Sequence, residues 1–122
     1  MIRQFILVAA GGGLGSMFRY GISQFVQNRV SAQFPFGTLA VNILGCFIIG
    51  ALYALAVRGG ISANARLFFA TGLCGGFTTF SAFSHETVAM LRDGQYLFAG
   101  LYISASVVCG IIATMSAIAI IK

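Results

Sequence analysis

The stretch Gly75–Glu86, GGFTTFSAFSHE, is the least typical part of this apolar chain. It lies in the third of four apolar segments, yet it holds two glycines, two threonines, two serines, a histidine and a glutamate among three phenylalanines. Glycines followed by β-branched residues form helix weakly, so we expect the helix to break at Gly75–Thr79. Broken backbone at membrane depth is tolerated only where it is buried or lines a cavity. The stretch therefore predicts a discontinuous membrane span with polar chemistry inside it.

The composition places the whole chain in a lipid bilayer. Its 122 residues are 59% hydrophobic and 7% charged, with a mean hydropathy of +0.98, whereas soluble domains carry about 25% charged residues. A spanning helix needs about 20 mostly apolar residues. Four segments meet that need: residues 4–27, 37–57, 66–91 and 95–121. The expected fold class is an all-α membrane protein, a single four-helix transmembrane domain over residues 1–122, whose third helix is broken near mid-membrane.

The charge pattern bears on membrane topology and gives no sign of nucleic-acid binding. The net charge is +5, but the basic residues are scattered at helix ends, and no basic cluster could hold a phosphate backbone. Four basic residues fall on the side of the two termini and two on the other side: Arg3, Arg58, Arg66 and Lys122 against Arg29 and Arg92. Because this bias is weak, the chain could insert in both orientations. Two oppositely inserted copies could then pair as an antiparallel, dual-topology homodimer about a two-fold axis.

The cysteines and the histidine do not predict a metal cluster. Cys46, Cys74 and Cys109 each lie in an apolar segment. We expect all three to be buried small hydrophobic residues, with no disulfide among them. The single His85 cannot form a metal site by itself.

The first span contains a run of glycines, GGGLGSMFRYG, over residues 11–21. Gly11 and Gly15 are four residues apart and therefore share a helix face. Small residues at this spacing let two helix backbones approach closely. We expect this face to pack against another helix.

Three polar side chains lie in the first two spans. Asn42, in GTLAVNILG, offers two donors and one acceptor, and either hydrogen-bonds across a helix interface or donates to a permeating anion. Thr38 lies one turn earlier, so that face is polar for two turns. Arg19, in GSMFRYG, either snorkels to the headgroups or supplies a positive potential at a pore entrance. The residues alone leave both choices open.

Aromatic and hydroxyl side chains run side by side after the expected break. Phe80 and Phe83 are three residues apart and share a helix face. The neighbouring hydroxyl side chains are those of Thr79, Ser81 and Ser84. Positive ring edges and hydroxyl donors could hold an anion, although rings that only pack and serines that bond to carbonyls are the alternative. Glu86 follows about a turn later, either at the mouth of a vestibule or as a water-facing residue at a helix end.

The expected break frees backbone carbonyls that need partners. In membrane transporters such carbonyls often coordinate a cation. A break near mid-membrane on the two-fold axis of an antiparallel dimer would bring carbonyls of both copies together. Such an oxygen cage suits a hard cation such as sodium.

Three stretches resemble signature regions of the Fluc/CrcB fluoride channels: GGGLGSMFRY, GTLAVNILGCFIIG and GLCGGFTTFSAFSHE. They occur in order through most of the chain, and the third motif is highly specific. The resemblance implies a passive, highly selective fluoride channel that exports cytoplasmic fluoride and lowers its toxicity. It also implies a multi-pass protein of the bacterial cytoplasmic (inner) membrane that works as an antiparallel homodimer with two pores.

The resemblance further implies roles for single residues. A structural sodium ion (Na+) at the dimer centre would be held by the backbone carbonyls of Gly75 and Thr78 from both subunits. The pore phenylalanines of the family match Phe80 and Phe83. The other residues of the implied fluoride pathway are Arg19, Thr38, Asn42, Thr79, Ser81, Ser84, Glu86 and Tyr102.

One position departs from the family pattern. The family reads FSTFS where this chain reads FSAFS, so Ala82 takes the place of a threonine hydroxyl. The phenylalanine pair and Ser81 remain. We expect the fold to persist and fluoride permeation to be slowed.

Two other functions compete with the channel. A small multidrug-type proton-coupled exporter is similar in span number and antiparallel pairing, but such exporters carry a glutamate in the first span, whereas the acidic residues here are Glu86 and Asp93. A non-transporting membrane assembly subunit would use Asn42 and the break for packing alone. No enzyme is expected, because the serines, His85 and Glu86 occupy helical positions that point apart and cannot converge as a triad.

Overall fold

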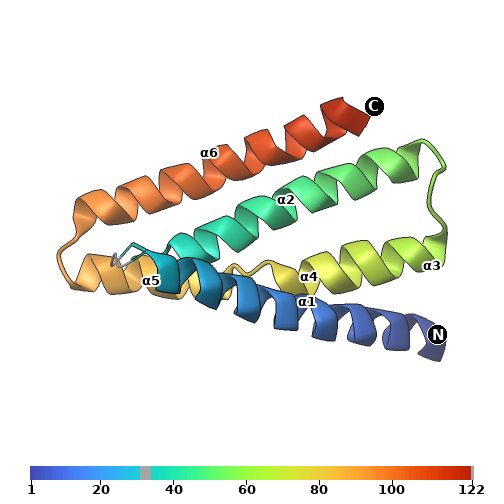
Figure 1. Ribbon diagram of the computed structural model, residues 1–122, viewed down its shortest axis with the longest axis horizontal. Coiled ribbons are helices and arrows are strands. Elements are labelled where there is room, and N and C mark those ends of the chain that lie inside the picture. The colour runs from blue at the N-terminus through green and yellow to red at the C-terminus, as the bar shows by residue number, and fades with distance from the viewer. Residues whose placement is uncertain (31–33, 122) are drawn as a thin grey trace.

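The computed structural model describes residues 1–30 and 34–121, and these are almost entirely helical (Figure 1). Four segments are long and apolar enough to cross a membrane by length and composition: α1 (Ile2–Arg29), α2 (Phe36–Val57), the third span (Ala63–Arg92) and α6 (Tyr96–Ile121). The predicted spans differ from these bounds by no more than three residues at either end. The four-helix membrane fold expected from the sequence is therefore confirmed for the single chain.

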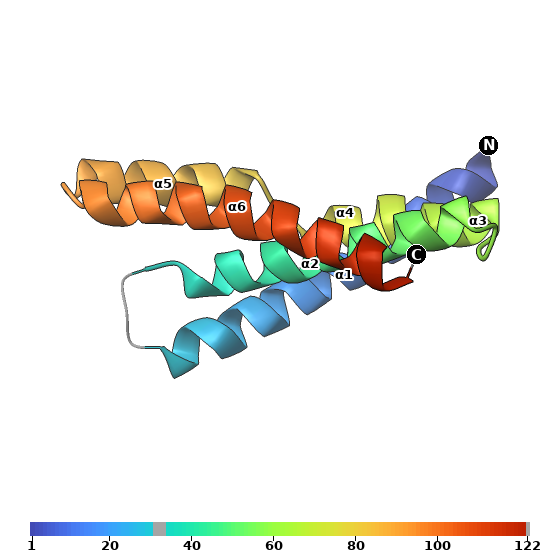
Figure 2. The same ribbon diagram turned by 90° about the horizontal axis from the view of Figure 1, so that it is seen from above.

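The helices pack as two main pairs. α6 lies along α2, and α1 lies along the first half of the third span. The second half of the third span runs beside α6, as Figure 2 shows from above. Both ends of the described chain lie at the same end of the bundle (Figure 1), where Arg58 Nη1 donates a hydrogen bond of 2.6 Å to Ile121 O. Lys122, which contributes to the charge bias, lies outside the described residues.

The third span consists of four helical pieces, with a break between the third piece and the fourth. It begins with α3 (Ala63–Arg66), continues as the π-helix η1 (Leu67–Cys74) and the short α4 (Gly75–Phe77), and resumes as α5 (Ser81–Arg92). Between α4 and α5 the backbone leaves the helix, and Thr78 is extended, with φ −91° and ψ 159°. The broken third helix is thus confirmed, while the π-helical segment had no signal that we recognised in the sequence.

The break lies further along the chain than the glycine pair suggested. Gly75 and Gly76 are helical, and the chain opens only at Thr78. Gly76 serves a different purpose, because a Cβ atom there would lie 3.0 Å from the carbonyl carbon of Gly12 on α1. The β-branched threonines tolerate extended backbone well. Close packing therefore explains the glycine, and the threonines accommodate the opening.

The glycine face of α1 packs directly on the third span. Gly11 and Gly15 are buried. A Cβ atom on Gly11 would lie 2.9 Å from Leu73 N, and one on Gly15 would lie 2.8 Å from Phe77 N. The close approach predicted from the Gly11 and Gly15 spacing is confirmed.

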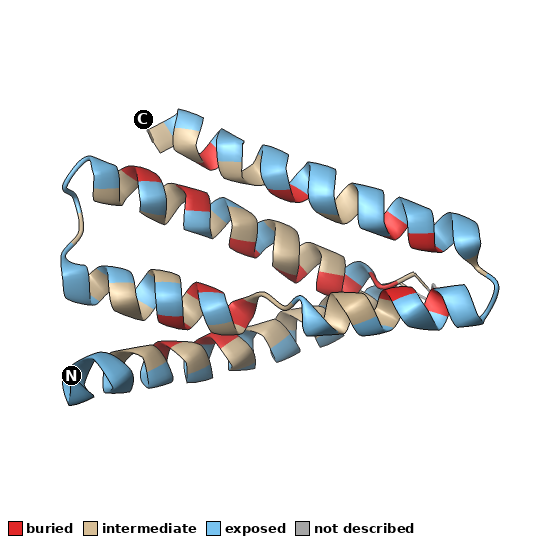
Figure 3. Cartoon of the chain, turned by 180° about the vertical axis from the view of Figure 1, so that it is seen from behind, coloured by how far each residue is buried: buried red, intermediate tan, exposed pale blue. Residues whose placement is uncertain are grey.

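Side-chain burial is restricted to the inner faces of the helices, and the outer faces are apolar and exposed (Figure 3). Val41 and Tyr102 are the largest fully buried side chains among the described residues. An exposed apolar exterior suits surrounding lipid. The prediction that all three cysteines are buried is wrong for Cys109, which faces outward from α6, whereas Cys74 is buried and Cys46 is partly buried.

Candidate functional site

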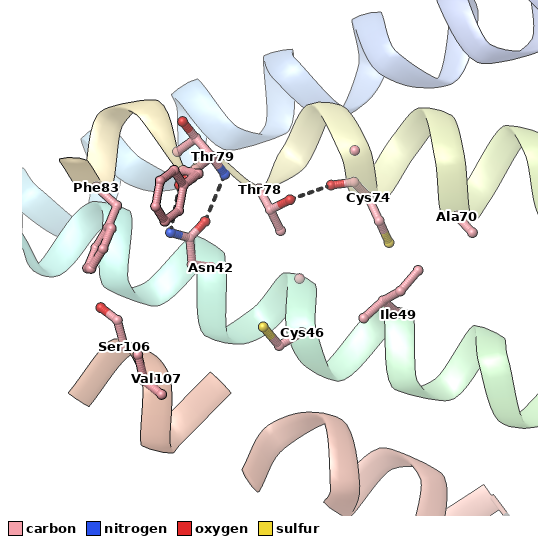
Figure 4. Close-up of a pocket in the computed structure, with 13 residues that line it drawn as sticks. Asn42, Cys46, Ile49, Ala70, Cys74, Thr78, Thr79, Phe83, Ser106 and Val107 are labelled. Carbon is pink, nitrogen blue, oxygen red and sulfur yellow. Dashed lines mark hydrogen bonds between the residues drawn. The ribbon is translucent and has the colours of Figure 1, made fainter. Parts of the chain in front are cut away.

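Asn42 on α2 binds the C-terminal side of the break, at Thr79, with a pair of hydrogen bonds. Its Nδ2 donates to Thr79 O at 3.0 Å, and its Oδ1 accepts from Thr79 N at 2.9 Å (Figure 4). The amide therefore replaces the backbone partners that Thr79 loses outside the helix. This arrangement is the helix-interface role considered from the sequence. Because Nδ2 carries two hydrogens and Thr79 O takes one, a second donor remains for another acceptor.

Arg19 on α1 binds the N-terminal side of the break, at Gly76. Its Nε donates to Gly76 O at 3.0 Å, and the contact is partly buried. Gly76 belongs to α4, the last helical piece before the opening. The two roles considered for Arg19 from the sequence were snorkelling to the headgroups and attracting anions to a pore entrance. Neither role predicted this hydrogen bond. The structure thus adds a contact that the sequence did not indicate.

Some carbonyl groups around the break accept hydrogen bonds, and others do not. Cys74 O accepts from both the backbone N and the Oγ1 of Thr78, at 3.0 and 2.9 Å. Gly76 O and Thr79 O accept from the side chains of Arg19 and Asn42. Among the hydrogen bonds of the described residues, none reaches Gly75 O or Thr78 O. These two oxygens are hard donors of the kind that alkali and alkaline-earth cations prefer.

A pocket of about 490 Å³ opens beside the break, between α2, the third span and α6 (Figure 4). Its wall is mostly apolar, and its polar residues include Asn42, Thr78, Thr79 and Ser106. The Oγ of Ser106 is buried and has no hydrogen-bond partner among the described residues. Ser106 was not selected from the sequence, because a serine in a membrane helix often bonds to its own backbone.

The phenylalanine pair lies at the edge of this pocket. The ring centroids of Phe80 and Phe83 are 5.6 Å apart, and the ring of Phe83 also lies 5.0 Å from that of Tyr102. Phe80 is 77% exposed in the single chain, and Phe83 is half-buried. The structure therefore brings the two rings together, as their spacing predicts, next to the tyrosine of α6.

Hydroxyl groups surround the start of α5. Thr79 Oγ1 accepts from Ala82 N at 3.1 Å and lies 3.3 Å from Ser81 Oγ. Thr79, which precedes the N-cap residue Phe80, therefore accepts from an amide in the first turn of α5 in addition to its bonds with Asn42. Ser81 is exposed and Ser84 is half-buried. The hydroxyl side chains selected from the sequence thus gather at the opening and along the first turn of α5.

Glu86 is held by two hydroxyl groups from other helices. Thr38 Oγ1 donates to Glu86 Oε2 at 3.0 Å, and Tyr102 OH donates to Glu86 Oε1 at 2.9 Å. Thr38 and Tyr102 are buried, so this carboxylate is anchored inside the bundle. Glu86 does not lie at a helix end, because it is in the middle of α5, and both of its carboxylate oxygens accept hydrogen bonds.

A second pocket, of about 530 Å³, adjoins Glu86 and Thr38 at the end of the bundle away from the termini. It is also lined by polar residues of α1 and of the turn before α6, including Ser23, Gln24 and Asp93. Its position next to Glu86 is consistent with the vestibule considered from the sequence. Among the described residues there is no group of three or more His, Cys, Asp or Glu side chains that could hold a metal ion.

These features define a four-span membrane protein whose third span is opened and held open by side chains of the first two. A family model described as "CrcB-like protein, Camphor Resistance (CrcB)" matches residues 6–118. The chain is 47% identical over 111 residues to a fluoride-specific ion channel FluC of Thermus thermophilus, covering 91% of this chain and 87% of that protein. Proteins of the same name from Phocaeicola vulgatus and Flavobacterium psychrophilum are 45% and 44% identical over 93% and 94% of this chain, and over 94% of each relative. The chain belongs to the CrcB family.

Proposed function

We propose that this chain forms a passive, fluoride-selective channel in the bacterial cytoplasmic membrane, and that it exports cytoplasmic fluoride. The observation that carries the proposal is its membership of a family whose similar members are named fluoride-specific channels. The geometry supports it, because amide, hydroxyl and aromatic groups meet at one opened span. A channel of this kind performs no covalent chemistry and is not an enzyme.

Fluoride is small and strongly hydrated, so a pathway must replace its water without trapping it. Several weak sites suit this need better than one strong site. The free amide hydrogen of Asn42 and the hydroxyls of Thr79, Ser81 and Ser84 would supply donors. The positive edges of Phe80 and Phe83 would line a narrow passage.

Beyond the rings, the proposed pathway continues along Thr38, Tyr102 and Glu86 to the second pocket. Tyr102 joins the two sections, because its ring contacts Phe83 while its hydroxyl donates to Glu86. Arg19 on α1 would add positive potential to the same half of the protein. Ala82 leaves a gap in the hydroxyl series, so we expect slower permeation than threonine would allow.

We further propose that the functional unit is an antiparallel homodimer of dual topology. Gly75 is exposed in the single chain, and among the described residues no other helix has an atom within 4 Å of a Cβ built on it. Phe80 is 77% exposed. Broken backbone facing lipid is costly. A second copy packed over this face would cover the opening and complete the walls of the pathway.

The same interface would hold a structural sodium ion. The oxygens of Gly75 and Thr78 accept no hydrogen bond within the described chain, and they fit a hard cation. Two carbonyls are too few for such an ion, because hard cations are held by more oxygen ligands than two. Equivalent carbonyls from a second copy would supply part of the remainder, so sodium would bind the two subunits together.

Fluoride efflux from liposomes that contain the purified protein tests the proposed function. Efflux is started with a potassium ionophore and followed with a fluoride-selective electrode, and the same liposomes are loaded with chloride as the control. Fast fluoride release without chloride release is the expected result. Absence of release from folded dimers, also after Ala82→Thr, would refute the channel and favour a non-transporting subunit. Release that needs a proton gradient would favour an exporter with Glu86 as its titrating group.

A further inference from the structure

The opening in the third span is not self-supporting. A helix leaves its last carbonyl groups without intrahelical donors, and α4 ends at Phe77 with the chain then extended at Thr78. Gly76 O would pair with Phe80 N in a continuous helix, but that bond is lost. Its donor is instead Arg19 Nε at 3.0 Å, from a residue 57 positions earlier in the sequence.

The position of Arg19 is fixed by the glycine face of α1. Gly12, Gly15 and Arg19 follow one another at intervals of three and four residues, which places them on one side of the helix. Gly12 and Gly15 lie in backbone contact with the third span around Gly76. Because the helices meet so closely, the guanidinium group one turn further along reaches the end of α4 and bonds to Gly76 O.

The charge of Arg19 suits this location. The end of the helical half-span that runs from Ala63 to Phe77 carries the negative pole of its dipole, and a cation near the last carbonyls is favourable there. A hydrogen bond from a charged donor is also stronger than a neutral one. Arg19 therefore acts as a C-terminal cap supplied by another helix.

We propose that Arg19 is a positioning residue that fixes the backbone conformation at the break. We call its hydrogen bond to Gly76 O the Arg19 clamp, and the bonds of Asn42 to Thr79 the Asn42 clamp. By bonding Gly76 O, Arg19 fixes α4 against α1, while Asn42 fixes Thr79 on the other side. With these bonds in place, Gly75 O and Thr78 O accept no hydrogen bond from the described residues. The consequence for sodium rests on the proposed function, whereas the Arg19 clamp itself depends only on the single chain.

Two substitutions separate the donor from the charge. In Arg19→Gln the amide nitrogen stands the same number of bonds from Cα as the arginine Nε, so the donor stays and the charge is lost. In Arg19→Lys a methylene occupies that place, so the charge stays and the donor moves one atom further out. Arg19→Met lacks both and serves as a second donor-free variant. Arg29→Gln is the matched control, because Arg29 also lies on α1 but stacks on Phe25 away from the break.

Hydrogen exchange of the Thr78 and Thr79 amides, measured by mass spectrometry in nanodiscs, reports on the Arg19 clamp directly. Both amides are hydrogen-bonded, to Cys74 O and to Asn42 Oδ1. We expect exchange about tenfold faster or more in Arg19→Lys and Arg19→Met, since a hydrogen bond from a charged group is lost. Arg19→Gln, which keeps the donor but loses the charge, should exchange at a rate between that of these two variants and that of the unmodified protein. Arg29→Gln should stay close to the unmodified protein, and peptides from α6 should not change in any variant.

Unchanged protection in Arg19→Lys and Arg19→Met would overturn the proposal. Equal loss of protection in Arg19→Gln and Arg19→Lys would also overturn it, because the complete guanidinium and not its Nε position would then matter. Sodium is tested separately by titrating the ion during dimer dissociation. If sodium stabilises no dimer of the unmodified protein, the proposed cation site fails, while the exchange result for Arg19 stands on its own.

Discussion

Replacing Gly15 by alanine tests whether the contact between α1 and the third span holds the opening in place. A methyl group on Gly15 would lie 2.8 Å from Phe77 N, and closer still to Leu73 O, whereas ordinary contacts begin at 3.4 Å. Both neighbours are backbone atoms, so neither can rotate away. The two helices must therefore separate by about 0.6 Å or more. This shift acts directly on Phe77, the last residue before the break.

The size of the effect follows from two opposing terms. Alanine is favoured over glycine inside a helix by roughly 0.5–1 kcal/mol. Forcing an extra methyl into a packed interface costs roughly 1–3 kcal/mol. Gly13→Ala and Gly21→Ala gain the first term alone, because no other helix of the described chain has an atom within 4 Å of a Cβ at either position. The difference between Gly15→Ala and these controls is therefore expected to be about 1–3 kcal/mol, towards the upper end because backbone atoms are involved.

Reversible unfolding in mixed detergent micelles measures this difference, and fluoride efflux is followed on the same preparations. Gly15→Ala should unfold more easily than both controls and should release fluoride more slowly, since the break is displaced. Two controls are used so that a contact between subunits at one of them can be recognised. If Gly15→Ala were as stable as Gly13→Ala and Gly21→Ala, the close backbone contact described for α1 would be refuted.

Three further substitutions test the pathway itself. Asn42→Ala removes both bonds to Thr79 and should lower the free energy of unfolding by about 1–4 kcal/mol, measured in detergent; a change below the error of the assay would contradict the Asn42 clamp. Tyr102→Phe keeps the ring but removes the hydroxyl that donates to Glu86. The free energy of unfolding should fall by about 0.5–1.5 kcal/mol, and fluoride efflux should slow. Unaltered efflux would place Tyr102 outside the pathway. Ala82→Thr should speed fluoride efflux from liposomes without altering unfolding, and equal rates would show that this hydroxyl is dispensable.

The spans could be predicted from the sequence because lipid leaves few alternatives. A chain in a bilayer must satisfy its backbone internally, so long apolar segments become helices. The bounds of α2, expected at residues 37–57, are Phe36–Val57, which differ by one residue. The glycine face of α1 was equally readable, because Gly11 and Gly15 have few uses other than close packing.

The point of opening was harder to predict than its existence. Weak helix formers at Gly75–Thr79 indicated a break, but helix propensity cannot say which residue leaves the helix. The glycines stay helical because α1 packs against them, and Thr78 opens because Asn42, 37 residues from Thr79, replaces the lost backbone bonds. Both causes are tertiary contacts, and they depend on how each helix is rotated. The π-helical η1 was missed for the same reason.

The hydrogen-bond partners of the polar side chains could not be predicted from the sequence, although the need for partners could. A polar group in lipid is costly unless it is paired, so the sequence indicated Asn42 and Arg19 as polar side chains that need an explanation, but not the atoms to which they bond. Where the described chain leaves polar atoms unpaired, they gather on one face: the pocket beside the break is lined by Ser106, Gly75 and Thr78. Since the same cost applies to these atoms, this face needs a covering partner, which is the physical reason to look for a second copy and an ion there.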